Sequence, residues 1–221
     1  MIADRLQQLR SEMPEGVTLV AVSKFHPVEA LQEAYDAGQR IFGESRVQEL
    51  LAKQPQLPDD IQWHFIGHLQ TNKVRHIIGR TSLIESIDTE RLLSIVDSES
   101  ARAGVTTRVL MQLHVAREET KFGFSPEELL DYFRDRRFEN LANTHICGVM
   151  GMASNTDDMA RVAADFDAIR SVYDRIINEV APDLRSFDIV SMGMSGDWSI
   201  AVSHGSNMVR IGSDIFGARQ Y

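Results

Sequence analysis

A lysine stands directly after a short apolar run near the start of the chain. Residues 18–23 read Thr-Leu-Val-Ala-Val-Ser, a pattern typical of a buried strand, and Lys24 follows where a loop would begin. Partial burial disfavours the ammonium form of a lysine, and a neutral amine can attack an aldehyde or ketone to form a Schiff base. Lys24 is therefore a candidate Schiff-base lysine. The alternative is an ordinary solvated loop lysine.

Glycine and hydroxyl residues gather in the last quarter of the chain. They occupy three segments, 191–197 (SMGMSGD), 204–207 (HGSN) and 209–212 (VRIG). Glycine lets backbone N–H groups approach an anion closely, and Ser195 and Ser206 can donate hydroxyl protons to it. A helix expected to start after Met194 would add the positive end of its dipole. These segments predict a phosphate site, unless the glycine turns only close the fold. They do not match the G-x-S-x-G pattern of serine hydrolases.

A Schiff-base lysine together with a phosphate site indicates two kinds of ligand. One is pyridoxal 5′-phosphate (PLP), whose aldehyde would react with the lysine. The other is a phosphorylated sugar, on which a Schiff-base aldolase would use the same lysine without a cofactor. Both ligands remain open on these residues alone.

Other reactive residue types give weaker signals. His64 and His68 lie four residues apart across the end of an expected strand, so we expect no metal site there, and we expect His64 to pack near the cofactor pocket. Lys121 is expected either to reach the face of the fold that binds the cofactor or to be a solvated loop lysine. Cys147 lies in an apolar run and is expected to be an inert core residue.

Short apolar runs alternate with longer amphipathic ones, which predicts repeated strand–helix units around a parallel sheet. The expected strands are Thr18–Ser23, Arg40–Gly43, Gln62–Gly67, Leu83–Ile87, Arg108–Val115, His145–Gly151, Phe187–Met192 and Met208–Gly212. The expected helices are Pro27–Ala37, Ser45–Ala52, Thr71–Ile78, Glu90–Ala103, Pro126–Arg137, Asp157–Val180 and a short one around Asp197–Ser203. Eight such units predict a single (β/α)8 TIM barrel over residues 1–221. An open doubly wound sheet is the alternative, but the G-x-G-x-x-G and P-loop fingerprints are absent.

Composition and charge exclude several classes of protein. The 221 residues carry a net charge of −9, which would repel nucleic acids and anionic membranes. No stretch resembles a signal peptide or a membrane span. The only cysteine is Cys147, so an intramolecular disulfide cannot form. We expect a cytoplasmic monomer.

The chain closely resembles the pyridoxal phosphate homeostasis protein family, which is related in fold to the N-terminal barrel of alanine racemase. The resemblance extends over essentially the whole chain. It rests on residues 21–24 (AVSK), 42–44 (FGE), 63–73 (WHFIGHLQTNK), 121–124 (KFGF), 148–152 (GVMGM), 191–195 (SMGMS), 209–212 (VRIG) and 215–217 (IFG).

The resemblance implies a fold-type III PLP site. Lys24 would hold the cofactor as a Schiff base, and Arg210 would face the pyridine nitrogen. Around the phosphate would lie Ser195, Ser206, Asn207 and the Gly212 backbone, and Ser45 and Met194 would also contact the cofactor. The family usually has asparagine in place of Ser45 and threonine in place of Asn207.

The resemblance also implies a role in intracellular PLP (vitamin B6) homeostasis, with PLP-dependent apoenzymes as possible recipients. A guanidinium beside the ring nitrogen opposes its protonation and weakens the ring as an electron sink. Alanine racemases share this arginine but add a C-terminal β domain and a tyrosine base, and we expect neither here. Three tyrosines, Tyr35, Tyr132 and Tyr173, fall in helical patterns and are expected to be packing residues. Little or no catalysis is therefore expected. A racemase-like enzyme using Lys24 is the alternative.

Overall fold

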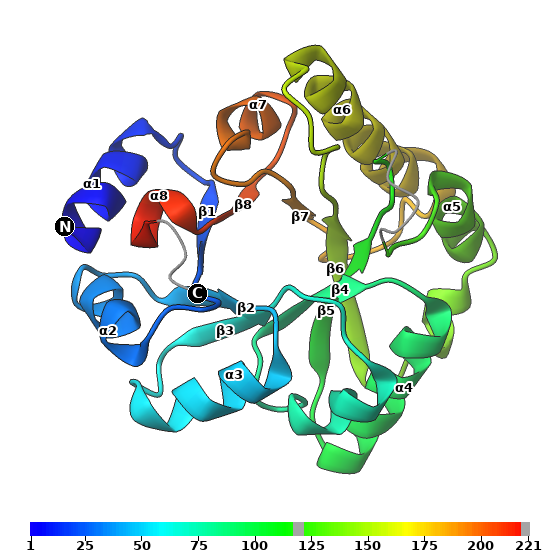
Figure 1. The fold of residues 1–221 in the computed structure, drawn as a ribbon. Coiled ribbons are helices and arrows are strands. Elements are labelled where there is room, and N and C mark those ends of the chain that lie inside the picture. The colour runs from blue at the N-terminus through cyan, green and yellow to red at the C-terminus, as the bar shows by residue number, and fades with distance from the viewer. Residues whose placement is uncertain (117–121, 218–221) are drawn as a thin grey trace.

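The computed structural model of the chain describes residues 1–116 and 122–217. Its centre is a closed barrel of parallel strands that follow one another in chain order, and Figure 1 shows it along the barrel axis. The strands are β1 (Thr18–Val22), β2 (Ile41–Glu44), β3 (Gln62–Phe65), β4 (Leu83–Ile87), β5 (Thr107–Gln112), β6 (Thr144–Met150), β7 (Ile189–Ser191) and β8 (Met208–Ile211). Each observed strand begins or ends within one residue of the corresponding end of its predicted range. The predicted (β/α)8 architecture is confirmed.

Helices surround the barrel on its outside, as Figure 1 shows. The α-helices are α1 (Ile2–Glu12), α2 (Val28–Asp36), α3 (Val47–Lys53), α4 (Glu90–Ala103), α5 (Pro126–Arg134), α6 (Met159–Arg175), α7 (Trp198–Ser203) and α8 (Ser213–Phe216). Shorter turns complete them: η1 (Gln54–Gln56), η2 (Thr71–His76), η3 (Arg137–Asn140) and η4 (Ile176–Val180). The expected helix at 71–78 is a 3₁₀ turn, and the one at 157–180 ends in a π-helical turn.

Local sequence signals set several helix boundaries. Ser125 and Glu128 form a reciprocal capping box at the start of α5, with Pro126 at the first helical position. Gly104 ends α4 in the left-handed region at φ 66°, where a side chain would be strained. Such residues fix where each helix meets the barrel.

Two apolar layers hold the fold together. The larger lies between the strands and the helices and includes Phe42, Phe65, Phe133 and Phe166, each no more than 1% exposed. The smaller is a cluster of strand residues, Val20, Leu83, Leu110, Cys147, Met150 and Met208. Cys147 is a buried free thiol, as expected of a core residue.

Strand β8 pairs unequally with its two neighbours in the barrel. Strands β1 and β8 pair from Thr18 with Met208 to Ala21 with Ile211, whereas β7 and β8 share one register pair, Ser191 with Met208. Side chains supplement the short β7–β8 seam. Asn207 accepts a hydrogen bond from the Val190 backbone N–H at 2.8 Å and donates to the carbonyl of the residue before β7 at 2.6 Å.

Within residues 1–116 and 122–217, no helix has the length and apolar character that a membrane span requires. Lys121, which the sequence analysis considered, lies outside the described ranges.

Candidate functional site

A cavity of about 250 Å³ opens at the carboxyl ends of the strands. This is the end of a (β/α)8 barrel at which active sites are built. Its wall comes from the ends of β1, β3, β6, β7 and β8 and the loops after them: Val22, Lys24, His26, Ile66, Met152, Met194, Ser195, Gly196, Arg210, Gly212, Ser213 and Gly217. Several of the residues that the sequence analysis assigned to the site, though not all of them, belong to this wall.

The cavity brings together five residues that the sequence analysis assigned to the cofactor. They are Lys24, Met194, Ser195, Arg210 and Gly212. Among the described residues of the wall none is acidic, while Lys24 and Arg210 are cationic. A net charge of −9 thus coexists with a cavity wall that has basic but no acidic residues among those described, which suits an anionic ligand.

Hydroxyls and glycine backbone gather at one end of the cavity. Ser195 accepts a hydrogen bond from the Gly212 N–H at 3.3 Å, which joins the loops after β7 and β8. A Cβ on Gly212 would lie 3.2 Å from the Val22 carbonyl oxygen, whereas a Cβ on Gly196 would meet nothing within 4 Å. The backbone at Gly196 is therefore open to a bound group. With the hydroxyl of Ser213 nearby, this end can cradle a phosphate without a cluster of lysines.

An aspartate fixes the loop after β7. The backbone N–H of Met194 donates to Oδ1 of Asp197 at 2.6 Å, and Arg210 N–H donates to the Gly193 carbonyl at 3.0 Å. Gly193 has φ +99° and no room for a side chain, because its Cβ would lie 2.6 Å from that of Ala201. Burial raises the pKa of Asp197, and the hydrogen bond from Met194 opposes this rise. The loop is therefore held before any ligand arrives.

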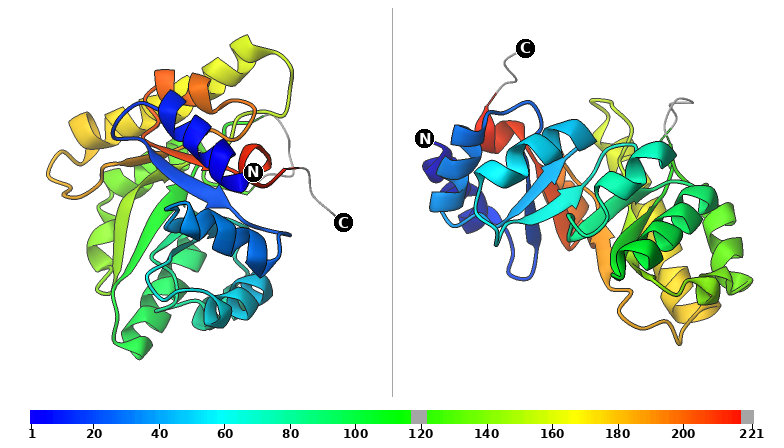
Figure 2. Two further views of the ribbon diagram at one scale, coloured as in Figure 1. Left: turned by 90° about the vertical axis from the view of Figure 1, so that its left-hand side faces the viewer. Right: turned by 90° about the horizontal axis from the view of Figure 1, so that it is seen from below.

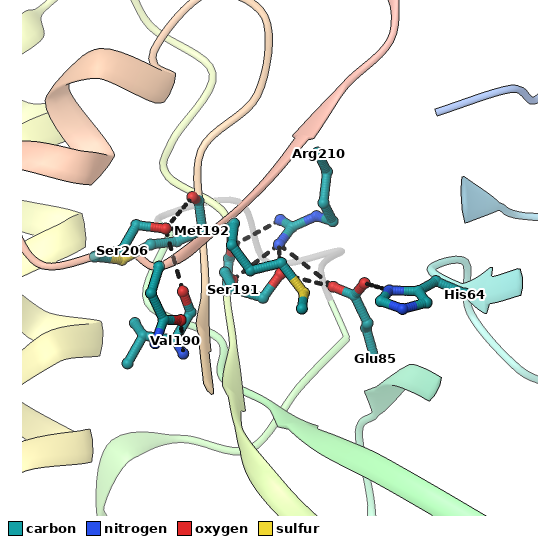
Figure 3. Close-up of polar contacts among 10 residues, drawn as sticks. His64, Glu85, Val190, Ser191, Met192, Ser206 and Arg210 are labelled. Carbon is teal, nitrogen blue, oxygen red and sulfur yellow. Dashed lines mark hydrogen bonds and ion pairs between the residues drawn. The ribbon is translucent and has the colours of Figure 1, made fainter. Parts of the chain in front are cut away.

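Arg210 crosses the inside of the barrel and is only 4% exposed. Its Nη1 donates to the Ser191 carbonyl at 2.8 Å and to the Ser191 hydroxyl at 2.6 Å, and its Nη2 donates to the Gly151 carbonyl at 2.9 Å. Glu85 lies 3.8 Å from Nη1. Figure 3 shows how these groups fix the guanidinium.

The network continues from Arg210 to the opposite strands. The Ser191 hydroxyl donates to Oε2 of Glu85 at 2.6 Å, and Oε1 of Glu85 lies 2.7 Å from Nδ1 of His64 (Figure 3). Burial raises the pKa of Glu85, but His64, Arg210 and Ser191 outweigh it and lower the pKa below its usual value. Burial lowers the pKa of Arg210, and Glu85 opposes that effect. Glu85 thus supplies the negative charge that lets a guanidinium be buried here.

Two predicted phosphate ligands lie elsewhere, which corrects the sequence prediction. Ser206 and Asn207 precede β8, and in a parallel barrel residues before a strand lie away from its carboxyl end. The Ser206 hydroxyl is within 2.7 Å of the Met192 carbonyl and 2.9 Å of the Met208 carbonyl, and Asn207 spans the β7–β8 seam. Neither is part of the cavity wall. Their polar groups are occupied by the backbone instead.

Ser45 and His64 also differ from expectation. Ser45 follows β2 at the same end of the barrel as the cavity, but Ser45 is not part of the cavity wall. It packs closely against Gly67, where an added Cβ would lie 2.3 Å from the Ser45 carbonyl oxygen. His64 lies inside the barrel against Glu85 and lines a depression at the opposite end. His68 pairs with Asp88 at 2.7 Å. No group of three or more potential metal ligands occurs in the described part of the chain.

Comparison with known proteins gives matches along the whole chain. The family model described as "Alanine racemase, N-terminal domain" matches residues 1–220. The pyridoxal phosphate homeostasis protein of Schizosaccharomyces pombe is 39% identical over 99% of this chain and 90% of its own length. This chain belongs to the pyridoxal phosphate homeostasis family. The family member from Aquifex aeolicus is 34% identical over 100% of this chain and 96% of its own.

Solved structures support the family assignment and the fold. PipY of Synechococcus elongatus, a COG0325 family member solved without PLP, matches with a TM-score of 0.92 at 36% identity over 98% of this chain and all of that one. A second PipY structure, with PLP bound, matches with a TM-score of 0.89. The alanine racemase of Clostridium difficile shares the barrel at a TM-score of 0.79 and 13% identity, and this chain covers 57% of it. The expected racemase-type barrel is confirmed.

Sequence reasoning missed several residues of the site, among them Ser213 in the cavity wall and Glu85 in the network behind Arg210. Ser213 lines the cavity, and its signal was its place directly after Gly212 at the carboxyl end of β8. Glu85 was missed although a carboxylate in the middle of the apolar strand β4 needs a buried partner. In both cases the signal was the residue's position relative to a strand.

Proposed function

We propose that this chain binds PLP in the cavity at the carboxyl end of the barrel, carries it on Lys24, and takes part in PLP homeostasis. The observation that carries the proposal is one cavity that combines Lys24, Arg210 and a serine–glycine cradle. The PLP-bound structure of PipY, 36% identical over 98% of this chain, supports it.

The residues of the wall suit the parts of this cofactor. The open backbone at Gly196 and the hydroxyls of Ser195 and Ser213 would bind the phosphate. Val22, Ile66 and Met152 offer apolar surface for the ring. A volume of about 250 Å³ lies just below the usual range for pockets of drug-sized ligands, which suits a small ligand such as one substituted ring with a phosphate.

Lys24 and Arg210 would have different tasks. The Nζ of Lys24 would form a C=N bond with the cofactor's aldehyde, and the aldehyde oxygen would leave as water. Arg210, held as a cation by Glu85 and Ser191, would face the ring nitrogen and oppose its protonation. Bound PLP supplies an electron sink for carbanions at the α-carbon of amino acids, and this arginine weakens that sink.

We further propose that the protein holds the cofactor and catalyses little. The described tyrosines that could act as a second base are engaged outside the cavity: Tyr35 donates to Asp60 at 2.7 Å and Tyr173 to the Phe187 carbonyl at 3.2 Å, while Tyr132 packs in α5. PLP-dependent apoenzymes would be the recipients. We also propose a cytoplasmic monomer; the single cysteine, Cys147, is a buried free thiol and fits a reducing compartment.

The proposal predicts a covalent adduct at one lysine. Wild-type protein mixed with PLP should show a visible Schiff-base absorbance that borohydride removes, and peptide mass analysis should locate the pyridoxyl group on Lys24. Lys24→Ala should lose the band and the adduct. Lys73→Ala, which alters a lysine outside the cavity wall, should keep both.

Three results would each count against the proposal. Absence of the band in wild-type protein would remove the cofactor from the function. A sugar trapped on Lys24 in place of the pyridoxyl group would indicate an aldolase. Exchange of the α-hydrogen of free amino acids with deuterated solvent would indicate a racemase-like enzyme.

A further inference from the structure

The two backbone groups that flank Lys24 are held by side chains of the next strand–helix unit. The carbonyl of Ser23, directly before Lys24, accepts a hydrogen bond from Nζ of Lys53 at 2.8 Å. The N–H of Phe25, directly after it, donates to Oε1 of Glu49 at 2.6 Å. Lys24 is thus held on both sides by residues of α3.

These side chains form one ionic cluster, in which Lys53 and Glu44 are buried and Glu49 is 19% exposed. Nζ of Lys53 lies 2.7 Å from Oε1 of Glu44 and 2.7 Å from Oε1 of Glu49, and the hydroxyl of Ser23 donates to Oε1 of Glu44 at 2.7 Å. The side chain of Lys53 is 7% exposed and that of Glu44 is fully buried. Lysine is rarely buried, and a buried ionic cluster is weak as a source of stability. Its place beside Lys24 suggests another use.

The backbone after Lys24 is strained. Phe25 has φ 68°, a left-handed conformation that is uncommon for a bulky residue and that the surroundings must impose. Glu49 holds its N–H, and the guanidinium of Arg46 lies over its ring at 4.7 Å. This bend lies directly after Lys24 and turns the chain away from β1. It therefore restrains the backbone to which the Lys24 side chain is attached.

We propose that Glu49 and Lys53 are positioning residues for Lys24. They fix the peptide groups on either side of it, so that its amine enters the cavity already placed for attack on an aldehyde. The inference rests on the proposed function, because it concerns Lys24 as the amine that carries PLP. Both residues act through Lys24 and need not touch the ligand.

Glu49→Ala is expected to slow the reaction of Lys24 with PLP. A misplacement of about 1 Å can reduce the rate of a positioned reaction about 100-fold, so we expect a loss between about tenfold and 100-fold. Glu49→Gln keeps an oxygen that can accept the Phe25 N–H and should recover most of the rate. Stopped-flow absorbance at the Schiff-base band measures the rate, and borohydride trapping with peptide mass analysis measures the share of label on Lys24 and on Lys53.

Asp97→Ala is the matched control. Oδ1 of Asp97, on α4, accepts the backbone N–H of Asn143 at 2.8 Å in the segment before β6, away from the cavity. Removing this carboxylate should lower stability, because one carboxylate–backbone hydrogen bond is lost as in Glu49→Ala. It should leave the rate of reaction with PLP unchanged. If Glu49→Ala does not fold, Glu49→Asp tests the same step, because its carboxylate is one methylene shorter, withdraws from the Phe25 N–H and should also slow the reaction.

The possible results separate the two levels of the proposal. If the wild-type and Asp97→Ala proteins form no Lys24 adduct, the proposed function fails. If they form it and Glu49→Ala reacts as fast as they do, the positioning inference alone is wrong. It is also wrong if Glu49→Gln is as slow as Glu49→Ala, because the acceptor oxygen would then have no role.

Discussion

Glu85→Ala is expected to lower the free energy of unfolding by about 3–5 kcal/mol, the range for removing one partner of a buried ion pair. The carboxylate is fully buried and contacts His64, Ser191 and Arg210. Without it, the buried Arg210 guanidinium would keep backbone carbonyls and the Ser191 hydroxyl as hydrogen-bond partners and Asp197 as an acidic neighbour, but would lose the carboxylate 3.8 Å away. Urea unfolding followed by circular dichroism measures the change. A loss below about 1 kcal/mol would mean that Arg210 does not depend on Glu85.

The same residue predicts a defined pH dependence. The folded pKa of Glu85 lies below its ordinary value of 4.5, so its ionised form contributes stability above that pH and loses it as the pH falls through the folded pKa. Glu85→Gln has no such group. The difference in unfolding free energy between wild-type and Glu85→Gln should therefore be constant near pH 7 and shrink below pH 4.5. Since all other carboxylates titrate in both proteins, a difference that stays constant down to pH 3 would contradict this assignment.

The barrel could be predicted because its strands carry a local signature. Buried parallel strands are nearly continuous in apolar residues, and caps such as Ser125 and Gly104 mark the helix ends. Helix α8 was missed because it has four residues, too few for a periodic pattern. It is held by tertiary contact: Arg5 of α1 donates to the Ile215 carbonyl at 3.3 Å, and Figure 2 shows α1 beside α8.

The site was only partly predictable, for two physical reasons. Residues were assigned to the phosphate by chemical type, and Ser206 and Asn207 have suitable types at the wrong end of β8. Strand direction separates them from Ser213, which follows the same strand. The contacts of Glu85 need the closed barrel, since Ser191 is 106 residues away in sequence. Local patterns predict elements, whereas a buried charge network depends on which strands face each other.

Replacing the two hydroxyls of the cradle is expected to remove much of the preference for PLP over pyridoxal, which lacks the phosphate. Hydrogen bonds to charged groups contribute about 1.5–3 kcal/mol each, so Ser195→Ala and Ser213→Ala should each lower the affinity ratio at least about tenfold. The double variant should lower it about 100-fold. Pyridoxal binding should change little, because Lys24 and Arg210 remain in place.

Ser206→Ala distinguishes the structure from the sequence prediction. Its hydroxyl lies among backbone carbonyls of β7 and β8, including that of Met192 at 2.7 Å, so the variant should lose stability and keep the PLP-to-pyridoxal ratio. Titrating each folded variant with the two aldehydes, followed by the Schiff-base absorbance, gives both affinities. If the PLP-to-pyridoxal affinity ratio falls as far in Ser206→Ala as in Ser195→Ala, the phosphate binds at the segment before β8, as the sequence predicted. A ratio that falls only in Ser195→Ala and Ser213→Ala would assign it to the loops after β7 and β8, where hydroxyls and open glycine backbone line the same cavity as Lys24.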